Sequence, residues 1–153
     1  MQPAVNETVI VSDNKEYEKF GFEVIADLIK DIGPAGGIYS ALHHSNQDLN
    51  FIVSCDMPFI TKEAIEFIIQ NTSYSKIILP VYQGNKEPLF AVYSKACLSR
   101  WLELIEQGCV KLQDLVNSFD LKTINVDHNK LFKKSFFTNI NTKTDFQEAI
   151  NLS

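Results

Sequence analysis

Short apolar runs alternate along the chain with segments in which apolar side chains recur every three or four residues. The runs are rich in β-branched residues and are bounded by turn formers, which is the pattern of strands. Strands are predicted at residues 8–12, 22–26, 50–55, 76–82, 89–93 and 123–126. Helices are predicted at residues 38–44, 62–69, 112–116 and 143–150, with one or two helical turns at 15–20. A further helix is predicted between its N-cap Ser94 and Gly108, with its apolar face at residues 98–105. This alternation predicts an α/β fold in three layers, with a mostly parallel sheet between helices.

Four local signals refine these elements. The uninterrupted apolar run at residues 51–53 predicts a strand that is covered on both faces. Pro80 predicts that its strand is bent or lies at a sheet edge, because proline cannot donate a ladder hydrogen bond. Thr61 is a predicted helix N-cap, and Thr142 with Asp145 forms a predicted capping box. Residues 136–141 are predicted to be strand or loop.

Length and composition agree with one globular domain spanning residues 1–153. The chain is 45% apolar and 22% charged, and it is long enough to bury a core without metals or disulfides. Its net charge of -5 argues against a nucleic-acid binder, which needs a clustered positive field. Small anionic ligands stay possible, because a bound metal or backbone N–H groups offset local charge.

The cysteines and the first residues indicate in which cellular compartment the protein is expected. Three scattered cysteines without a C-x-x-C pair support neither a disulfide framework nor a zinc ribbon, and an odd number suits a reducing compartment. The first residues lack the basic start and apolar stretch of a signal peptide, and no run is long enough to span a membrane. The expected protein is cytoplasmic and binds no membrane.

Asp56 is the first candidate for chemistry. It follows a buried-type strand, and ligands of open α/β sheets bind at the carboxyl ends of strands. Magnesium prefers oxygen ligands and commonly takes one or two carboxylates together with substrate phosphates. The alternative is that Asp56 only forms an Asx turn. Cys55 is expected on the opposite face of the strand, as a small core residue rather than a nucleophile.

A glycine-rich segment and a second aspartate form the next candidate site. Gly33, Gly36 and Gly37 precede a predicted helix, where exposed backbone N–H groups and the helix dipole favour anions. The spacing matches no nucleotide-binding motif, and the alternative is a plain loop entering a helix. Asp27 ends the preceding strand. It either flanks the same phosphate or metal site as Asp56 or is a helix-entry acid.

Asn139 and Asn141 form the last candidate pair. They alternate across one residue, so in a strand both amides point to one face. Amides donate to phosphate and accept from hydroxyls. The alternative is turn chemistry before the last helix.

Four blocks of this sequence resemble one family when they are taken in order. They are V-I-A-D at residues 24–27, G-P-A-G-G-I at 33–38, V-S-C-D-M-P-F at 53–59 and F-T-N-I-N-T at 137–142. Their order and spacing resemble the molybdenum cofactor guanylyltransferases, which are Rossmann-like nucleotidyltransferases. The segment E-P-L-F-A at residues 87–91 also resembles a strand of that family. The resemblance runs from about residue 9 to the end of the chain.

The resemblance implies an activity, its ligands and a set of site residues. Such enzymes transfer GMP from GTP to molybdopterin with magnesium and release pyrophosphate. Asp56 matches the magnesium aspartate and Asp27 an acid of the nucleotide site. The segment at residues 33–37 matches the loop beside the nucleotide. Ser12 and Asp13 fall where the family often has an asparagine near the guanine, and the Asn139 and Asn141 pair matches the pterin side of the cleft.

The sequence departs from the family at its start. The family begins with a strand and an L-A-G-G-x-S-x-R-M-G-x-D-K segment, which this sequence does not contain. The central strand is therefore expected to be missing, which leaves two strands with open edges. We expect such a chain to form homo-oligomers, to exchange a segment, or to be part of a longer protein. Two alternatives to a guanylyltransferase stay open. One is a non-catalytic relative that binds a nucleotide or a partner, and the other is a sister cytidylyl or sugar-phosphate nucleotidyltransferase.

Overall fold

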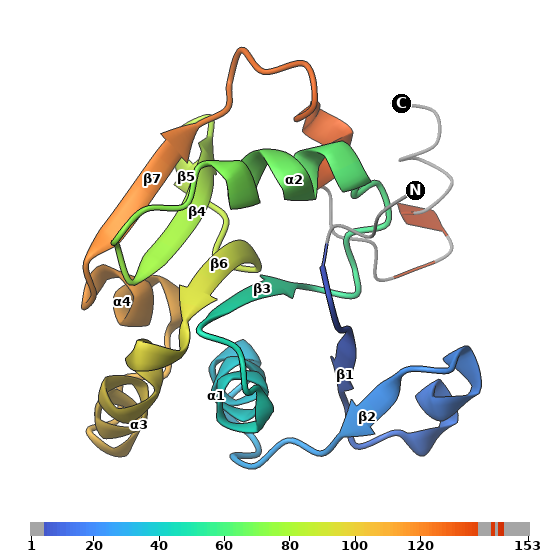
Figure 1. Cartoon of the computed structure of the whole chain (residues 1–153), viewed down its shortest axis with the longest axis vertical. Coiled ribbons are helices and arrows are strands. Elements are labelled where there is room, and N and C mark those ends of the chain that lie inside the picture. Colours follow the sequence, from blue (N-terminus) through green and yellow to red (C-terminus); the bar gives the residue numbers. More distant parts are fainter. Residues whose placement is uncertain (1–4, 138–141, 143, 146–153) are drawn as a thin grey trace.

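The strands form two separate sheets in the computed structural model, which describes residues 5–137, 142, 144 and 145 (Figure 1). The larger sheet has the order β3-β6-β4-β5, and β7 lies on the other side of β4. Its strands are β3 (Leu49–Val53), β4 (Ile77–Tyr82), β5 (Asn85–Lys86), β6 (Phe90–Ser94) and β7 (Leu121–Asn125). The smaller sheet pairs β1 (Val9–Val11) with β2 (Glu23–Ile25).

The larger sheet is mixed, whereas the sequence predicted a mostly parallel one. β6 is antiparallel to both β3 and β4, and β5 is antiparallel to β4. β4–β7 and β1–β2 are the parallel pairs of the described strands. β3 and β4 run in the same direction but are separated by β6, so most hydrogen-bonded neighbours in this sheet are antiparallel.

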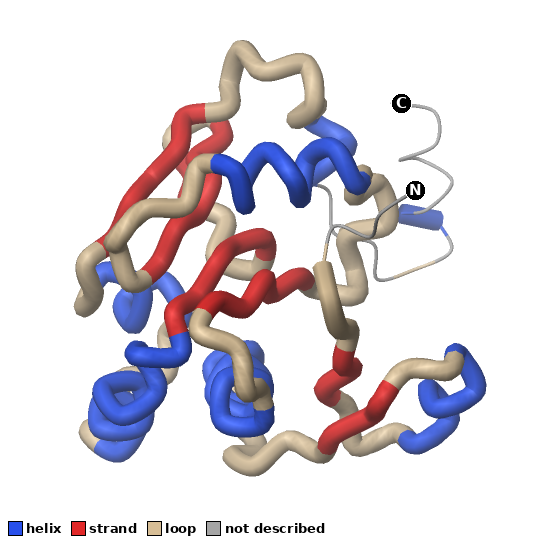
Figure 2. Tube along the Cα trace, viewed as in Figure 1, coloured by secondary structure: helices blue, strands red, loops and turns tan. Residues whose placement is uncertain are grey.

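Helices cover both faces of the larger sheet and complete the predicted three layers (Figure 2). On one face, α1 (Pro34–His44), α3 (Leu98–Glu106) and α4 (Leu112–Asn117) share a core around Trp101 with the inner side chains of β4 and β6. On the other face, α2 (Lys62–Gln70) and the 3-10 helix η3 (Lys134–Phe137) enclose a second core around Phe90. Two further 3-10 helices are η1 (Lys15–Phe20) and η2 (Lys95–Cys97). No described helix has the length and hydropathy that crossing a membrane requires.

Two predicted helix caps are confirmed. Thr61 accepts a hydrogen bond from the backbone N–H of Ala64 at 3.3 Å, at the start of α2. Thr142 and Asp145 form the reciprocal capping box, with bonds of 2.8 and 3.1 Å. The helix predicted beyond Asp145 lies outside the described residues. Residues 134–137 form η3, so the prediction of strand or loop from residue 136 is wrong for its first two residues.

Pro80 was predicted to mark a strand that is bent or at an edge, and the edge alternative is wrong because Pro80 lies inside the larger sheet. β4 pairs with β7 along one side, including at Pro80, and on its other side pairs first with β6 and then with β5. The carbonyl of Pro80 accepts from the N–H of Glu87, so Pro80 faces the β6 and β5 side. Proline has no backbone N–H to donate. At Pro80 this position faces the point where the partner of β4 changes from β6 to β5, so no ladder hydrogen bond is lost there.

β3 is less covered than its apolar sequence predicted. Leu49 and Val53 are 48% and 44% exposed. β3 pairs with β6 and with no other described strand. One edge of β3 is therefore unpaired among the described residues, and no described strand covers its outer side chains.

Candidate functional site

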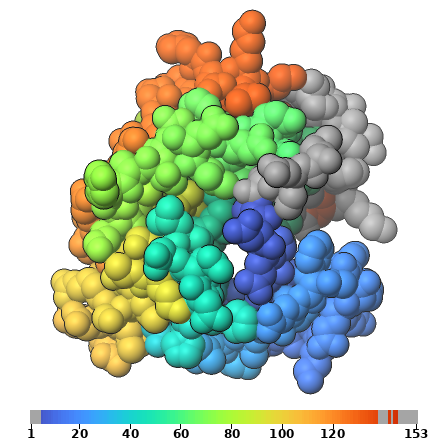
Figure 3. Space-filling model, viewed as in Figure 1, coloured from blue at the N-terminus to red at the C-terminus, as the bar shows by residue number. Residues whose placement is uncertain are grey.

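A groove of about 950 Å³ separates β1 from β3. Its walls include residues of both strands, residues along the whole length of α1 and apolar residues of α2. Figure 3 shows the opening between the dark-blue segment that carries β1 and the cyan segment around β3. Among the described candidate site residues, Gly37 lines the groove. The others form two groups, one after β1 and β2 and one after β3.

The first group begins where β1 ends. The backbone N–H of Ser12 bonds to the carbonyl of Ile25 at 2.9 Å, which holds the exits of β1 and β2 together. Asp13 forms an ion pair with Lys30 at 2.8 Å. The hydrogen bond from Lys30 lowers the pKa of Asp13, and the same bond raises the pKa of Lys30. Both groups are exposed, so the pair orients the loop after β2 and stabilises it little.

Asp27 is held by a buried hydroxyl. The Oγ of Ser40, which is fully buried, lies 2.8 Å from Asp27 Oδ1 and accepts the N–H of Leu28 at 2.8 Å. The N–H of Ile29 bonds to the same carboxylate oxygen at 3.3 Å. Asp27 therefore fastens the loop at residues 28–33 to α1. Asp27 does not lie at the entry of α1, whose first turn contains no acidic residue, so the helix-entry alternative is wrong, and its role as a ligand stays a prediction.

The glycine-rich segment is mostly helix rather than loop, which corrects the predicted helix start at residue 38. Pro34 occupies the first position of α1, where proline's fixed φ is favourable, and Gly36 and Gly37 lie in the first turn. Gly33 alone precedes the helix, with a left-handed φ of 64°. A Cβ on Gly36 would lie 2.1 Å from the carbonyl oxygen of Ile29, so the loop approaches α1 too closely for any other residue. Gly37 lines the groove.

Asp56 forms the second group, on the β3 side of the groove. Its Oδ1 is buried and has no hydrogen-bond partner among the described residues. A buried carboxylate oxygen without a partner costs free energy, and a bound cation removes that cost. The donor set therefore fits a magnesium ion. The described residues contain no group of three metal-ligating side chains, so Asp56 would hold the ion with water and substrate oxygens.

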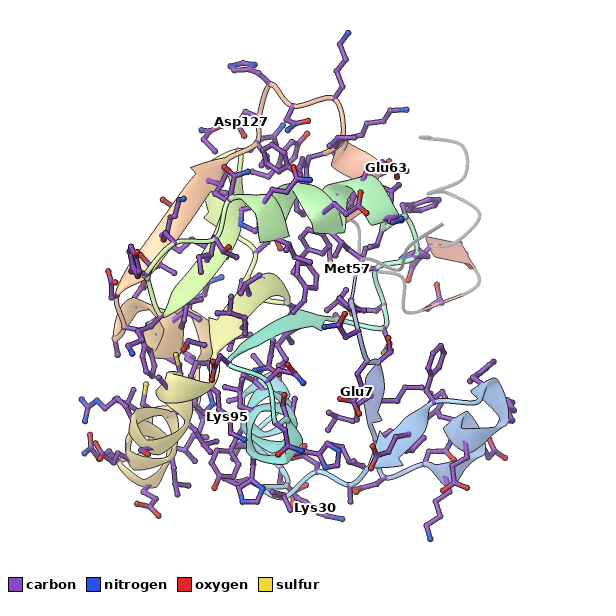
Figure 4. The ribbon with its side chains drawn as sticks, in the orientation of Figure 1. Glu7, Lys30, Met57, Glu63, Lys95 and Asp127 are labelled. Atoms are coloured by element: carbon purple, nitrogen blue, oxygen red, sulfur yellow. The ribbon has the colours of Figure 1, made fainter. Side chains whose placement is uncertain are left out.

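The structure does not bring the two groups together. Figure 4 labels Lys30, beside the first group, and Met57, next to Asp56, far apart in the view. Asn139 and Asn141 lie outside the described residues. Cys55 is exposed, which corrects the expected core position. Its exposure follows from its place at the end of β3, next to the open groove.

The sequence reasoning did not single out Lys30, Ser40 or Glu87. Burial raises the pKa of Glu87 to about 7. Its neighbour Leu89 accepts the N–H of Ser54 at 3.0 Å, which places Glu87 close to the exit of β3. The sequence feature that could have singled out Glu87 is its position directly before Pro88. The role of Ser40 had no local signal, because its partners Asp27 and Leu28 lie 13 and 12 residues away.

Comparisons with known proteins identify relatives over most of the chain. The family described as MobA-like NTP transferase domain matches residues 1–123. A Flavobacterium johnsoniae protein named "Probable molybdenum cofactor guanylyltransferase" is 34% identical over 99% of this chain and 79% of its own length. The solved structure of molybdopterin-guanine dinucleotide biosynthesis protein A from Archaeoglobus fulgidus has a TM-score of 0.76 at 28% identity, covering 93% of this chain and 76% of that one. CMP:2-keto-3-deoxy-manno-octonic acid synthetase shares the fold, with a TM-score of 0.72 at 13% identity over 97% of this chain and 80% of that one.

Proposed function

This chain belongs to the MobA-like NTP transferase family, and we propose that it transfers GMP from GTP to molybdopterin and releases pyrophosphate. The product is the guanine dinucleotide form of the molybdenum cofactor. The observation that carries this proposal is the 34% identity to the Flavobacterium johnsoniae protein, which extends over 99% of the chain. The family membership makes the chain a nucleotidyltransferase of molybdenum cofactor biosynthesis, and its substrates and site residues are proposed here.

The site residues suit phosphoryl-type transfer, in which catalysis consists of positioning and charge neutralisation. Asp56 would hold magnesium, which supplies positive charge that stabilises the triphosphate and the departing pyrophosphate. Asp27 and Ser40 fix the loop at residues 28–33 against the start of α1, close to Gly37 on the groove wall. The Asp13–Lys30 pair holds that loop to the exit of β1. We assign the nucleotide to this side of the groove, and the pterin contacts of Asn139 and Asn141 remain a prediction from the sequence.

Turnover is the decisive test. The chain is incubated with GTP, magnesium and molybdopterin, and pyrophosphate and the dinucleotide product are measured. We expect Asp56→Asn to lower the rate by at least 100-fold, because removing one charge-stabilising group costs on the order of 10²–10³ in rate. Asp120→Asn is the matched control, since Asp120 is exposed and precedes β7 at the opposite edge of the sheet. An Asp56→Asn protein that is folded and fully active would contradict the assignment.

A second candidate is a relative that binds the nucleotide without turnover. One observation favours it, namely that Figure 4 shows Lys30, the ion-pair partner of Asp13, far from Met57, the neighbour of Asp56. Calorimetric titration of GTP with and without magnesium separates the two. Magnesium-dependent binding without pyrophosphate release supports the second candidate, and turnover supports the first. Preference for CTP over GTP in the same titration would identify a cytidylyltransferase instead.

The location of the protein is proposed from its thiols. Cys55, Cys97 and Cys109 are all free in the structure, as is usual in the reducing cytoplasm. Cell fractionation with an antibody to the chain tests this cytoplasmic location.

A further inference from the structure

A partly buried carboxyl group lies at the same edge of the larger sheet as Asp56. β3 and β4 are both antiparallel to β6, so their carboxyl ends share one edge with the start of β6. Asp56 follows β3 at this edge, Tyr82 ends β4, and Glu87 precedes β6. The N–H of Ser54 bonds to the carbonyl of Leu89 at 3.0 Å and joins the exit of β3 to the loop that carries Glu87. Three neighbouring strands thus supply side chains to the edge at which α/β sheets bind ligands.

Glu87 and Tyr82 project from the same face of the β4–β5 hairpin. The hairpin pairs Tyr82 with Asn85. Two residues further along each strand, the N–H of Glu87 bonds to the carbonyl of Pro80 at 3.1 Å. Because side chains alternate with a period of two, Glu87 and Tyr82 are diagonal neighbours on one face, within reach of each other. Tyr82 packs against the core around Phe90, so this is the face that α2 and η3 cover (Figure 1).

Tyr82 is the outer ring of a stack of three aromatic side chains. Its ring centroid lies 4.7 Å from that of Phe137, with 27° between the ring planes. Phe137 in turn lies 6.1 Å from Phe132, with 11° between the planes. Phe132 is buried, whereas Phe137 and Tyr82 are half-buried, so the stack runs from the core toward the surface. Phe137 is the ring partner of Tyr82 among the described residues, and a further planar ring would extend the stack on the other face of Tyr82.

The carboxyl group of Glu87 lacks a partner within the part of the chain that the structure describes. No hydrogen bond or ion pair reaches it there. Burial raises its pKa to about 7, because the charged form has lost water without gaining a donor. A ligand that donates N–H groups to both carboxylate oxygens would restore what burial has removed.

A carboxylate beside an aromatic ring is complementary to a 2-amino-4-oxo heterocycle. The 2-amino group and the adjacent ring N–H of such a heterocycle are two parallel donors, which a carboxylate accepts together. Pterins and guanine share this edge. The groove to which the nucleotide is assigned lies between β1 and β3, whereas Glu87 and Tyr82 lie beyond β3, at β6 and β4. The heterocycle at Glu87 therefore belongs to the acceptor.

We propose that Tyr82 and Glu87 form the subsite for the pterin ring of molybdopterin, with the ring stacked on Tyr82 and its 2-amino group and N3–H donating to the Glu87 carboxylate. This inference rests on the proposed function, which makes molybdopterin the acceptor. The strand order places Asp56 between the nucleotide side and this subsite, as transfer between two bound substrates requires. Glu87 is then a specificity residue, because a ring without the 2-amino group leaves one of its oxygens unpaired.

The test uses two fluorescent probes that differ at one position. They are 6-hydroxymethylpterin and 6-hydroxymethyllumazine, in which a carbonyl replaces the 2-amino group. Fluorescence quenching measures the binding of each to the whole chain at a pH above about 7, where the Glu87 carboxyl is charged. We expect the pterin to bind at least tenfold more tightly, because a site built to accept a donor rejects a ligand that lacks it. Equal affinity of the two probes, or binding of neither, would overturn the proposal.

Substitutions at Glu87 and Tyr82 locate the site. Glu87→Gln keeps the shape of the side chain but can accept only one of the two N–H bonds, so it should weaken pterin binding at least tenfold and remove the preference over lumazine. Glu106→Gln is the matched control, because Glu106 is exposed at the end of α3, on the other face of the sheet, and should change neither affinity. Equal pterin affinity of these two variants would place the ring elsewhere.

The stacking contact has its own pair of variants. Tyr82→Phe keeps the ring and should bind the pterin as the unmodified chain does, whereas Tyr82→Leu removes the ring and should weaken binding at least tenfold. Circular dichroism confirms that both variants are folded. A folded Tyr82→Leu variant with unchanged pterin affinity would contradict the stacking.

GTP offers the same edge through its guanine, and competition distinguishes the two sources. We expect the pterin probe and GTP with magnesium to bind at the same time, and Glu87→Gln to leave the affinity for GTP unchanged. Displacement of the probe by GTP, together with an equal loss of GTP affinity in Glu87→Gln, would assign the subsite to guanine and overturn the proposal.

Turnover separates a failure of this inference from a failure of the proposed function. In the unmodified chain with GTP and molybdopterin, we expect pyrophosphate release, and in Glu87→Gln a KM for molybdopterin raised at least tenfold with a smaller change in kcat. Turnover with an unchanged KM for molybdopterin in Glu87→Gln would keep the guanylyltransferase and overturn the subsite. Pterin binding that depends on Glu87 without any pyrophosphate release would keep the subsite and contradict the guanylyltransferase.

Discussion

Two adjacent glycines in the first turn of α1 have opposite surroundings, and substituting each by alanine tests how the loop at residues 28–33 packs. A Cβ on Gly36 would lie 2.1 Å from the carbonyl oxygen of Ile29 and 3.1 Å from Asp27 Oδ1. A Cβ on Gly37 would meet no atom within 4 Å. Neither glycine has a positive φ, so alanine itself suits both backbones. The two variants therefore differ only in what the methyl group meets.

The magnitudes follow from two opposing effects. Alanine is better than glycine in a helix by about 0.5–1 kcal/mol, and Gly37→Ala should gain about that much stability. Gly36→Ala has the same intrinsic gain, but its new methyl group would meet the backbone carbonyl of Ile29, which cannot rotate away. Overpacking of this kind costs about 1–3 kcal/mol. The difference between the two variants isolates this steric cost, and it corresponds to about 2–12 °C in Tm for a chain of this size.

Thermal unfolding followed by circular dichroism, with urea unfolding at 25 °C, measures both variants against the unmodified chain. We expect Gly37→Ala to melt at or above the unmodified chain and Gly36→Ala to melt below it. The loop contact also predicts that Gly36→Ala weakens GTP binding while Gly37→Ala leaves the loop in place. Equal stability of the two variants would refute the close approach of Ile29 to α1.

Two further changes test the polar groups of the site. Ser40→Ala leaves the N–H of Leu28 and the carboxylate of Asp27 without their buried partner, so unfolding in urea should show a loss of about 1–3 kcal/mol. Ser118→Ala, whose exposed hydroxyl bonds one carbonyl, is the control and should lose less than about 0.5 kcal/mol. Burial raises the pKa of Glu87 to about 7, so the folded chain keeps a proton that the unfolded chain loses near pH 4.3. The stabilisation that Glu87 contributes is therefore fully present below about pH 4 and is lost as the pH rises to about 7. Urea unfolding across this pH range measures it, and Glu87→Gln should remove this part of the pH dependence.

The sequence was sufficient for those elements that depend on local rules. Thr61 caps α2 and Thr142 pairs with Asp145 because both motifs are complete within four residues. The alternation of apolar runs and helical spacing located every strand of the described residues except the two-residue β5. Such signals need no knowledge of which elements become neighbours.

The remaining features depend on contacts between distant segments. Glycine is unfavourable inside a helix, yet α1 needs glycine at position 36, because any side chain there would collide with the loop at Ile29. Pro80 reads as an edge residue, and only the change of partner from β6 to β5 makes an interior place possible. Asp56 was predicted from its place after a strand. The buried oxygen without a partner adds a reason that no sequence pattern contains, and its role in binding magnesium stays a proposal.

For β3, the sequence prediction and the structure disagree on how far the strand is covered. Its sequence is that of a strand covered on both faces, but Leu49 and Val53 are about half exposed, and its outer edge is unpaired among the described strands. Apolar open edges promote aggregation, and proteins ordinarily protect them with charge, proline or a bulge. β3 has none of these between Leu49 and Val53, and the apolar residues of α1 and α2 that line the groove have no strand between them. Both mismatches have one physical cause, because no described strand lies against the free edge of β3.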